Sequence, residues 1–119
     1  MSTGAVHFDP RGNVLVAQMS GEIDLTNAEQ LGIQVAEATP PEALAVVLDL
    51  TAVEYLDSYG IFVIHGLRAR LGEHQQRLVL VVPKDGIIRR AVDLVALAEV
   101  VPVKDELEDA LQVAREFGR

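Results

Sequence analysis

Residues 45–61 read AVVLDLTAVEYLDSYGI, and this stretch decides the fold. It opens with a nearly unbroken apolar run, Ala45–Leu50, which has the length of a strand and is typical of a strand covered by helices on both faces. Residues 51–57 are expected to form the loop that follows. Asp57-Ser58-Tyr59-Gly60 then stands where a helix should begin. The core-facing stripe of this helix is predicted to consist of Ile61, Ile64, Leu67 and Leu71.

A second apolar strand, Leu78–Val82, follows this helix and ends at Pro83. The order strand, helix, strand predicts parallel pairing, with the first of the two strands in a central position. In open α/β sheets, functional groups gather beyond the carboxyl ends of the strands. The segment after Leu50, up to Ser58, is therefore the first place to look for function.

The N-terminal part of the chain predicts a β-hairpin and a helix. Ala5–Phe8 and Val14–Met19 flank Asp9–Asn13, in which proline and glycine favour a turn. After residues 21–25, a helix is expected to begin with Thr26 as its N-cap and to end at Pro40-Pro41.

The C-terminal third predicts a helix capped by Asp85, a short strand at Val100–Val103 and a last helix from Asp105 to Phe117. The inward positions of the first of these helices are expected to be Ile88, Val92, Val95 and Ala96. The fold class is thus α/β: an N-terminal β-hairpin followed by βα units, with a mixed, mostly parallel sheet and helices packed against it. Residues 1–119 fit one domain.

Composition and charge disfavour several kinds of binding partner and chemistry. With 18 acidic and 10 basic residues, the net charge of -8 disfavours direct binding to nucleic acid, whose phosphates repel such a field. A partner protein with a basic patch fits better. The apolar runs are shorter than the roughly 20 residues that cross a bilayer, and no signal pattern is present, so we expect a cytoplasmic protein without membrane insertion. Cysteine is absent, which excludes disulfides and thiolate chemistry.

Ser58 has two interpretations. As an N-cap, its hydroxyl would accept a backbone N–H of the helix, a bond worth about 1 kcal/mol against alanine. As an exposed hydroxyl beside the positive end of the helix dipole, it would be a place where an added phosphate is tolerated. The two interpretations are compatible.

An enzymatic function finds little support in the sequence. His65 lies seven residues after Ser58 on the same predicted helix, ~10.5 Å along its axis, which is too far for a general base. Asp49 at a strand end is similar to the acceptor of phosphoaspartate receivers, but the acidic pair expected after a first strand is missing, so we interpret it as a loop-anchoring acceptor. The histidines have no metal-ligand spacing. We expect no catalytic residues, no metal and no cofactor.

Val47-Leu48-Asp49-Leu50, then Val53, then Leu56-Asp57-Ser58-Tyr59-Gly60-Ile61 resemble the signature of STAS domains of the anti-sigma factor antagonist type. Gly21-Glu22-Ile23-Asp24-Leu25 resembles the family's turn before its first helix, and the element order matches along nearly the whole chain. Two departures stand out. Tyr59 occupies a position where a small residue is usual, and Val95-Ala96-Leu97 replaces a typical Thr-Gly-Leu.

The resemblance implies a switch. In that family the unphosphorylated antagonist binds an anti-sigma factor that is also a serine kinase, which frees the sigma factor; the kinase phosphorylates the antagonist's serine, and a PP2C-type phosphatase reverses this. Ser58 would be the phosphorylated residue. Asp57 beside it and Asp24, in the matching turn near the same surface, would bind the partner together with Ser58. Tyr59 changes what a kinase pocket must admit.

Two questions stay open in the sequence. Tyr59 and Phe62 lie off the core stripe and would form an aromatic partner-binding patch beside Ser58, unless Phe62 packs under the preceding loop. STAS-like domains also serve as scaffold subunits of stress-sensing assemblies and as small subunits of membrane lipid transporters. Those roles would need binding without sigma factor control.

Overall fold

The computed structural model describes residues 4–117 and contains one five-stranded sheet, in the order β1-β2-β3-β4-β5. The hairpin β1–β2 is antiparallel and every other neighbouring pair is parallel. The strands are β1 (Ala5–Arg11), β2 (Val14–Ile23), β3 (Ala45–Leu56), β4 (Arg77–Val81) and β5 (Val103–Lys104). The predicted hairpin, the mixed and mostly parallel sheet and the central place of β3 are confirmed.

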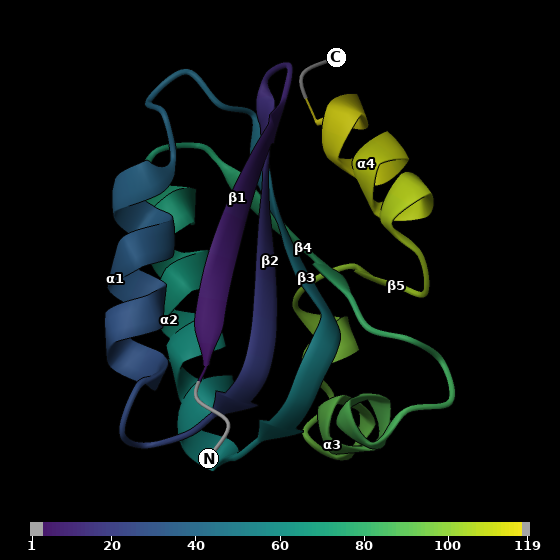
Figure 1. Ribbon diagram of the computed structural model, residues 1–119. Coiled ribbons are helices and arrows are strands. Elements are labelled where there is room, and N and C mark those ends of the chain that lie inside the picture. The colour runs from purple at the N-terminus through teal and green to yellow at the C-terminus, as the bar shows by residue number, and fades with distance from the viewer. Residues whose placement is uncertain (1–3, 118–119) are drawn as a thin grey trace.

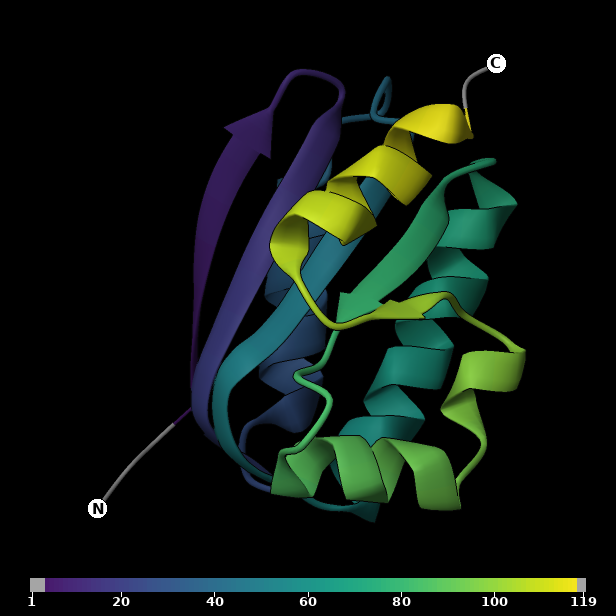
Figure 2. The same cartoon turned by 90° about the vertical axis from the view of Figure 1, so that its right-hand side faces the viewer.

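Helices cover both faces of the sheet. α1 and α2 lie side by side on one face and α4 lies on the other, while α3 packs against β3 near the end of that strand (Figures 1 and 2). The helices are α1 (Ala28–Ala38), α2 (Ser58–Glu73), α3 (Ile87–Leu94) and α4 (Leu107–Glu116), with a 3-10 turn, η1 (Leu97–Glu99), between α3 and β5. Within residues 4–117, every helix is too short or too polar to cross a lipid bilayer.

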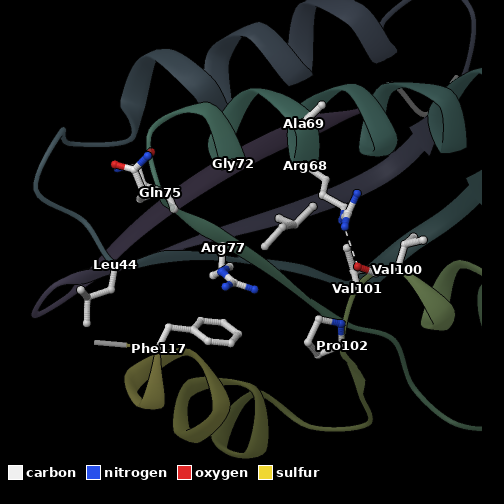
Figure 3. Close-up of a pocket in the computed structure, with 12 residues that line it drawn as sticks. Leu44, Arg68, Ala69, Gly72, Gln75, Arg77, Val100, Val101, Pro102 and Phe117 are labelled. Carbon is white, nitrogen blue, oxygen red and sulfur yellow. Dashed lines mark hydrogen bonds between the residues drawn. The ribbon is translucent and has the colours of Figure 1, made fainter. Parts of the chain in front are cut away.

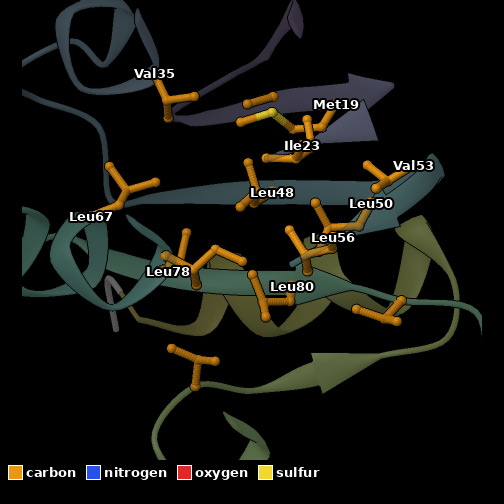
Figure 4. Close-up of a cluster of buried hydrophobic side chains, with 14 of the residues drawn as sticks. Met19, Ile23, Val35, Leu48, Leu50, Val53, Leu56, Leu67, Leu78 and Leu80 are labelled. Carbon is orange, nitrogen blue, oxygen red and sulfur yellow. The ribbon is translucent and has the colours of Figure 1, made fainter. Parts of the chain in front are cut away.

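The sheet separates two apolar clusters, because successive side chains of a strand point to opposite faces. On β3, Leu48 and Leu50 face α1 and α2, whereas Val47 faces α4. Figure 4 shows the larger cluster, in which residues of β2, β3 and β4 meet the two helices. The predicted stripe of α2 is buried at all four positions, Ile61, Ile64, Leu67 and Leu71.

Two connections are shorter than the sequence suggested. Asp9, Pro10 and Arg11 belong to β1 and pair with β2, so the hairpin turn consists of Gly12, at φ +65, and Asn13. Pro10 is tolerated there because β1 is an edge strand.

The loop expected at residues 51–57 is wrong, since β3 continues to Leu56. The reason is that β2 also continues past Met19 to Ile23 and supplies partners for this extension, with two register shifts along the way. Val53 and Leu56 are buried in the extended part.

The segment after β4 differs most from expectation. The N-cap of α3 is Gly86 rather than Asp85, and Val95 and Ala96 are exposed instead of inward. The chain reverses at Ala96, whose backbone is left-handed at φ +53, and Leu97 is the residue that enters the core. The strand of this segment is Val103–Lys104 rather than Val100–Val103.

The last helix begins at Leu107, later than predicted, and Glu106 is its N-cap residue. Asp105 is not the cap because its carboxylate accepts a hydrogen bond from Arg89 at 2.7 Å instead.

Candidate functional site

The register between β2 and β3 brings the two predicted turns together. Ile23, the last residue of β2, pairs with Leu56, the last residue of β3. The amide of Asp57 donates to the carbonyl of Ile23 at 3.3 Å. Because the strands are parallel, Asp24 and the Asp57-Ser58 pair leave the same edge of the sheet side by side.

Asp57, and not Ser58, caps α2. Its Oδ1 accepts the amide hydrogens of Tyr59 at 3.0 Å and Gly60 at 3.1 Å, while its backbone stays extended. Ser58 is the first residue of the helix and is exposed. The N-cap interpretation of Ser58 is therefore wrong, because the carboxylate one residue earlier already satisfies the amides that a serine would have reached.

Gly60 allows the start of α2 to approach the strands. A Cβ at this position would collide with Leu56 Cδ1 and lie 3.4 Å from Ile23 Cγ2. The glycine two residues after Ser58 thus lets the first turn of α2 pack closely against the last residues of β2 and β3.

Asp24 organises the neighbouring turn. Its Oδ1 accepts hydrogen bonds from the Thr26 hydroxyl at 2.5 Å and the Thr26 amide at 2.9 Å, and these bonds hold the pKa of Asp24 below its usual value of 3.8. Thr26 is consequently not the N-cap of α1, since its hydroxyl is used by Asp24. Asn27 takes that position, and its side chain bridges the Asp24 amide and the Glu22 carbonyl.

The two aromatic residues of the predicted patch lie together but differ in exposure. Their ring centroids are 6.0 Å apart, and Tyr59 is half-buried against the core. Phe62 is 68% exposed, so the alternative in which it packs under a loop is wrong. No loop precedes α2 to cover it, because β3 runs up to Leu56.

Leu25 is a residue of this region that the sequence reasoning missed. It stands between Asp24 and Thr26 and is 67% exposed, an apolar side chain in an otherwise polar turn. That mismatch of residue type was the available signal. We call Asp24, Leu25, Ser58, Tyr59 and Phe62 the Ser58 surface.

The structure also places the residues that a catalytic or metal site would need. His65 lies on α2 with Ser58, seven residues further along the same helix, and is exposed. In the part of the chain described, no three His, Cys, Asp or Glu residues gather as a metal site would require. Asp49 is buried on β3, where it accepts hydrogen bonds from the amide and hydroxyl of Thr51.

Comparison with known proteins places the chain in a family. The family model described as STAS domain matches residues 6–110. The anti-sigma-F factor antagonist RsfB of Mycobacterium tuberculosis is 31% identical over 102 residues, which cover 86% of this chain and 82% of that protein.

Solved structures agree with the sequence comparison. The crystal structure of an anti-sigma factor antagonist from Mycobacterium paratuberculosis superposes with a TM-score of 0.80 at 31% identity, covering 95% of both chains. The structure of the anti-sigma factor antagonist SpoIIAA in its unphosphorylated form gives a TM-score of 0.75 over 94% of this chain and 97% of that one. At 18% identity, this second likeness concerns the fold alone.

Proposed function

The chain belongs to the STAS domain family, and on that premise we propose that it is an anti-sigma factor antagonist switched by phosphorylation of Ser58. In the unphosphorylated form it binds an anti-sigma factor with serine kinase activity and so regulates transcription. Phosphorylation by that kinase ends the binding, and a PP2C-type phosphatase restores it. The protein acts in the cytoplasm as a binding switch rather than as an enzyme.

The observation that supports this proposal most is that the residue capping α2 is not the residue that would be phosphorylated. Asp57 supplies the cap, so a phosphate on the exposed Ser58 would displace no bond that holds the helix. The helix dipole favours negative charge in its first turn by roughly 0.3 to 1 kcal/mol. The fold is therefore expected to survive the modification.

The surroundings of Ser58 explain why a phosphate would stop binding. Asp24, Leu25 and Phe62 present a carboxylate and two exposed apolar side chains beside the serine. A partner that covers them would desolvate the phosphate, which carries about -1.5 to -2 charges. Two like charges ~4 Å apart repel by about 4 kcal/mol at an effective dielectric constant of ~20, and half of that already weakens affinity more than tenfold.

The test is a pull-down from host lysate followed by affinity measurement, using the unmodified chain, Ser58→Asp and Gln112→Asp. Gln112 is exposed on α4, on the opposite face of the sheet, so its substitution controls for added charge alone. We expect the unmodified chain and Gln112→Asp to bind a kinase-like ATPase equally, and Ser58→Asp to bind at least tenfold more weakly with native circular dichroism. Equal affinity of all three chains would remove the switch.

Modification itself is tested by mass spectrometry after incubation with the captured kinase and ATP. A single phosphate on Ser58 is expected, and Ser58→Ala should remain unmodified. Capture of a membrane transporter, or assembly into large particles, would instead favour the scaffold or transporter role.

A further inference from the structure

A cleft at the other end of α2 has no part in the proposed switch. Figure 3 shows it between the second half of α2, the start of β4, the segment before β5 and Phe117 after α4. Its volume is ≈ 570 Å³, which lies in the range of small-molecule sites. α2 is 16 residues long, or ~24 Å, with Ser58 at its first position and Gly72 near its last. The cleft and the Ser58 surface are thus separate.

The charge of the cleft is opposite to that of the chain. Two arginines, Arg68 from α2 and Arg77 from β4, line it. Among its described lining residues there is no Asp or Glu, although the chain has 18 acidic and 10 basic residues. A concave surface with walls of low dielectric concentrates the field of such cations.

Both guanidinium groups are held in place without a counterion. Arg68 Nε donates to the carbonyl of Val100 at 2.9 Å, which fixes the group while its terminal nitrogens stay available. Arg77 lies over the Phe117 ring, with its guanidinium carbon 5.3 Å from the ring centroid. The ion pairs found in residues 4–117 involve Arg11 and Arg89, and neither cleft arginine lies within 4.0 Å of a carboxylate there.

Apart from Gln75 and Gln76, the remaining walls are apolar or small. Ala69 and Gly72 form the α2 side, where short side chains leave room, and Val101 and the Phe117 ring form other parts of the lining. β5 pairs with β4 only at Leu80 and Val81, so no strand fills the space beside Arg77. The site therefore offers a flat apolar surface next to two guanidinium groups, which bind carboxylates and phosphates through their N–H donors.

We propose that this cleft binds a small organic anion in which a carboxylate or phosphate group is joined to a planar apolar body. The anionic group lies between Arg68 and Arg77, and the planar body packs against Phe117 and the short side chains of α2. Either head group satisfies the guanidinium donors, and the two are distinguished by the probes below.

The test is a titration of the isotopically labelled full chain, followed by NMR, with benzoate, phenyl phosphate and neutral benzamide at constant ionic strength. We expect saturable shifts of the Arg68 and Arg77 side-chain signals and of the Gly72 and Val101 amides with benzoate or phenyl phosphate. The stronger of these two probes identifies the preferred head group. Benzamide should bind at least tenfold more weakly, because it lacks the charge that the arginines recognise.

Arginine variants distinguish specific binding in the cleft from non-specific attraction of the anions to arginine side chains. Arg68→Gln and Arg77→Gln should each weaken binding by about tenfold, while Arg70→Gln should leave it unchanged. Arg70 lies on the same helix but borders the groove between α1 and α2. The proposal is overturned if neither anion gives saturable shifts at the two arginines, if benzamide binds as well, or if Arg70→Gln has the same effect as the cleft variants.

Discussion

Asp57 accepts the first amide hydrogens of α2, and its neighbour Ser58 is thereby left exposed with a hydroxyl that capping does not use. Asp57→Ala should lower the free energy of unfolding by about 1 kcal/mol, whereas Asp57→Asn, which keeps an acceptor oxygen, and Ser58→Ala should change it by less than about 0.5 kcal/mol. Urea unfolding measures the free energy of unfolding of all three variants. If Ser58→Ala were as destabilising as Asp57→Ala, the assignment of the cap would be incorrect.

Phe62 is expected to contribute to binding and not to stability. Phe62→Ala should change the melting temperature little, because the ring is 68% exposed, yet it should weaken partner binding about tenfold or more. Val100→Ala is a suitable control, since this side chain is also exposed but lies at the far cleft. A large loss of stability in Phe62→Ala would show that the ring belongs to the core.

Ala96 has a left-handed backbone at φ +53, at the position where the family pattern has glycine. Ala96→Gly should raise the free energy of unfolding by about 1 kcal/mol, because the left-handed conformation costs an L-residue roughly 1 to 2 kcal/mol. Ala98→Gly, at an exposed position of η1 without positive φ, should be destabilising by about 0.5 kcal/mol or more. Thermal unfolding of the two variants gives shifts of opposite sign if the backbone is as described.

Two glycines of α2 should respond oppositely to alanine. Gly66 has no atom within 4 Å of an added Cβ, so Gly66→Ala should stabilise the protein by about 0.5 to 1 kcal/mol through helix propensity. At Gly60 the added methyl collides with Leu56, so Gly60→Ala should destabilise by about 1 to 3 kcal/mol. Chemical denaturation of both variants tests the close contact, and a stabilising Gly60→Ala would argue against it.

The stability that the turn at Asp24 contributes should depend on pH. Its pKa is lowered by the hydroxyl and amide of Thr26, so the folded state binds this proton more weakly than the unfolded chain. The resulting stabilisation is complete above the ordinary value of 3.8 and is lost as the pH falls below it through the folded pKa. Thr26→Ala should raise the pKa of Asp24, measured by carboxyl NMR. Thr39→Ala, whose hydroxyl donates to the Val35 carbonyl, should not.

The sequence predicted those elements in which burial and periodicity agree. The runs of β3 and β4 and the core stripe of α2 are apolar because two helical layers cover the sheet, and that requirement is visible in residue type alone. The extension of β3 to Leu56 was hidden, because its exposed residues Thr51, Glu54 and Tyr55 resemble a polar loop. Only the matching extension of β2 makes them a strand.

The sequence indicated the residues of the candidate site but predicted the wrong capping hydrogen bonds for them. Asp57 and Ser58 are both good N-cap residues, and so are Thr26 and Asn27. Propensity cannot rank such neighbours. The choice was made by the register of two strands, which sets where each helix begins. The cleft around Arg68 and Arg77 joins residues from separate elements, which only the fold brings together.

The short connection between β3 and α2, a single residue, has a thermodynamic consequence. A docking surface carried by a mobile connection must be ordered by its partner, at about 1 to 2 kcal/mol of entropy for each residue fixed. Here that ordering is complete once the chain has folded, since only Asp57 separates Ser58 from β3 and its amide is hydrogen-bonded to the carbonyl of Ile23. Under the proposed switch, a partner would meet a surface that folding has already ordered, and a phosphate on Ser58 would act through its charge rather than through a change of shape.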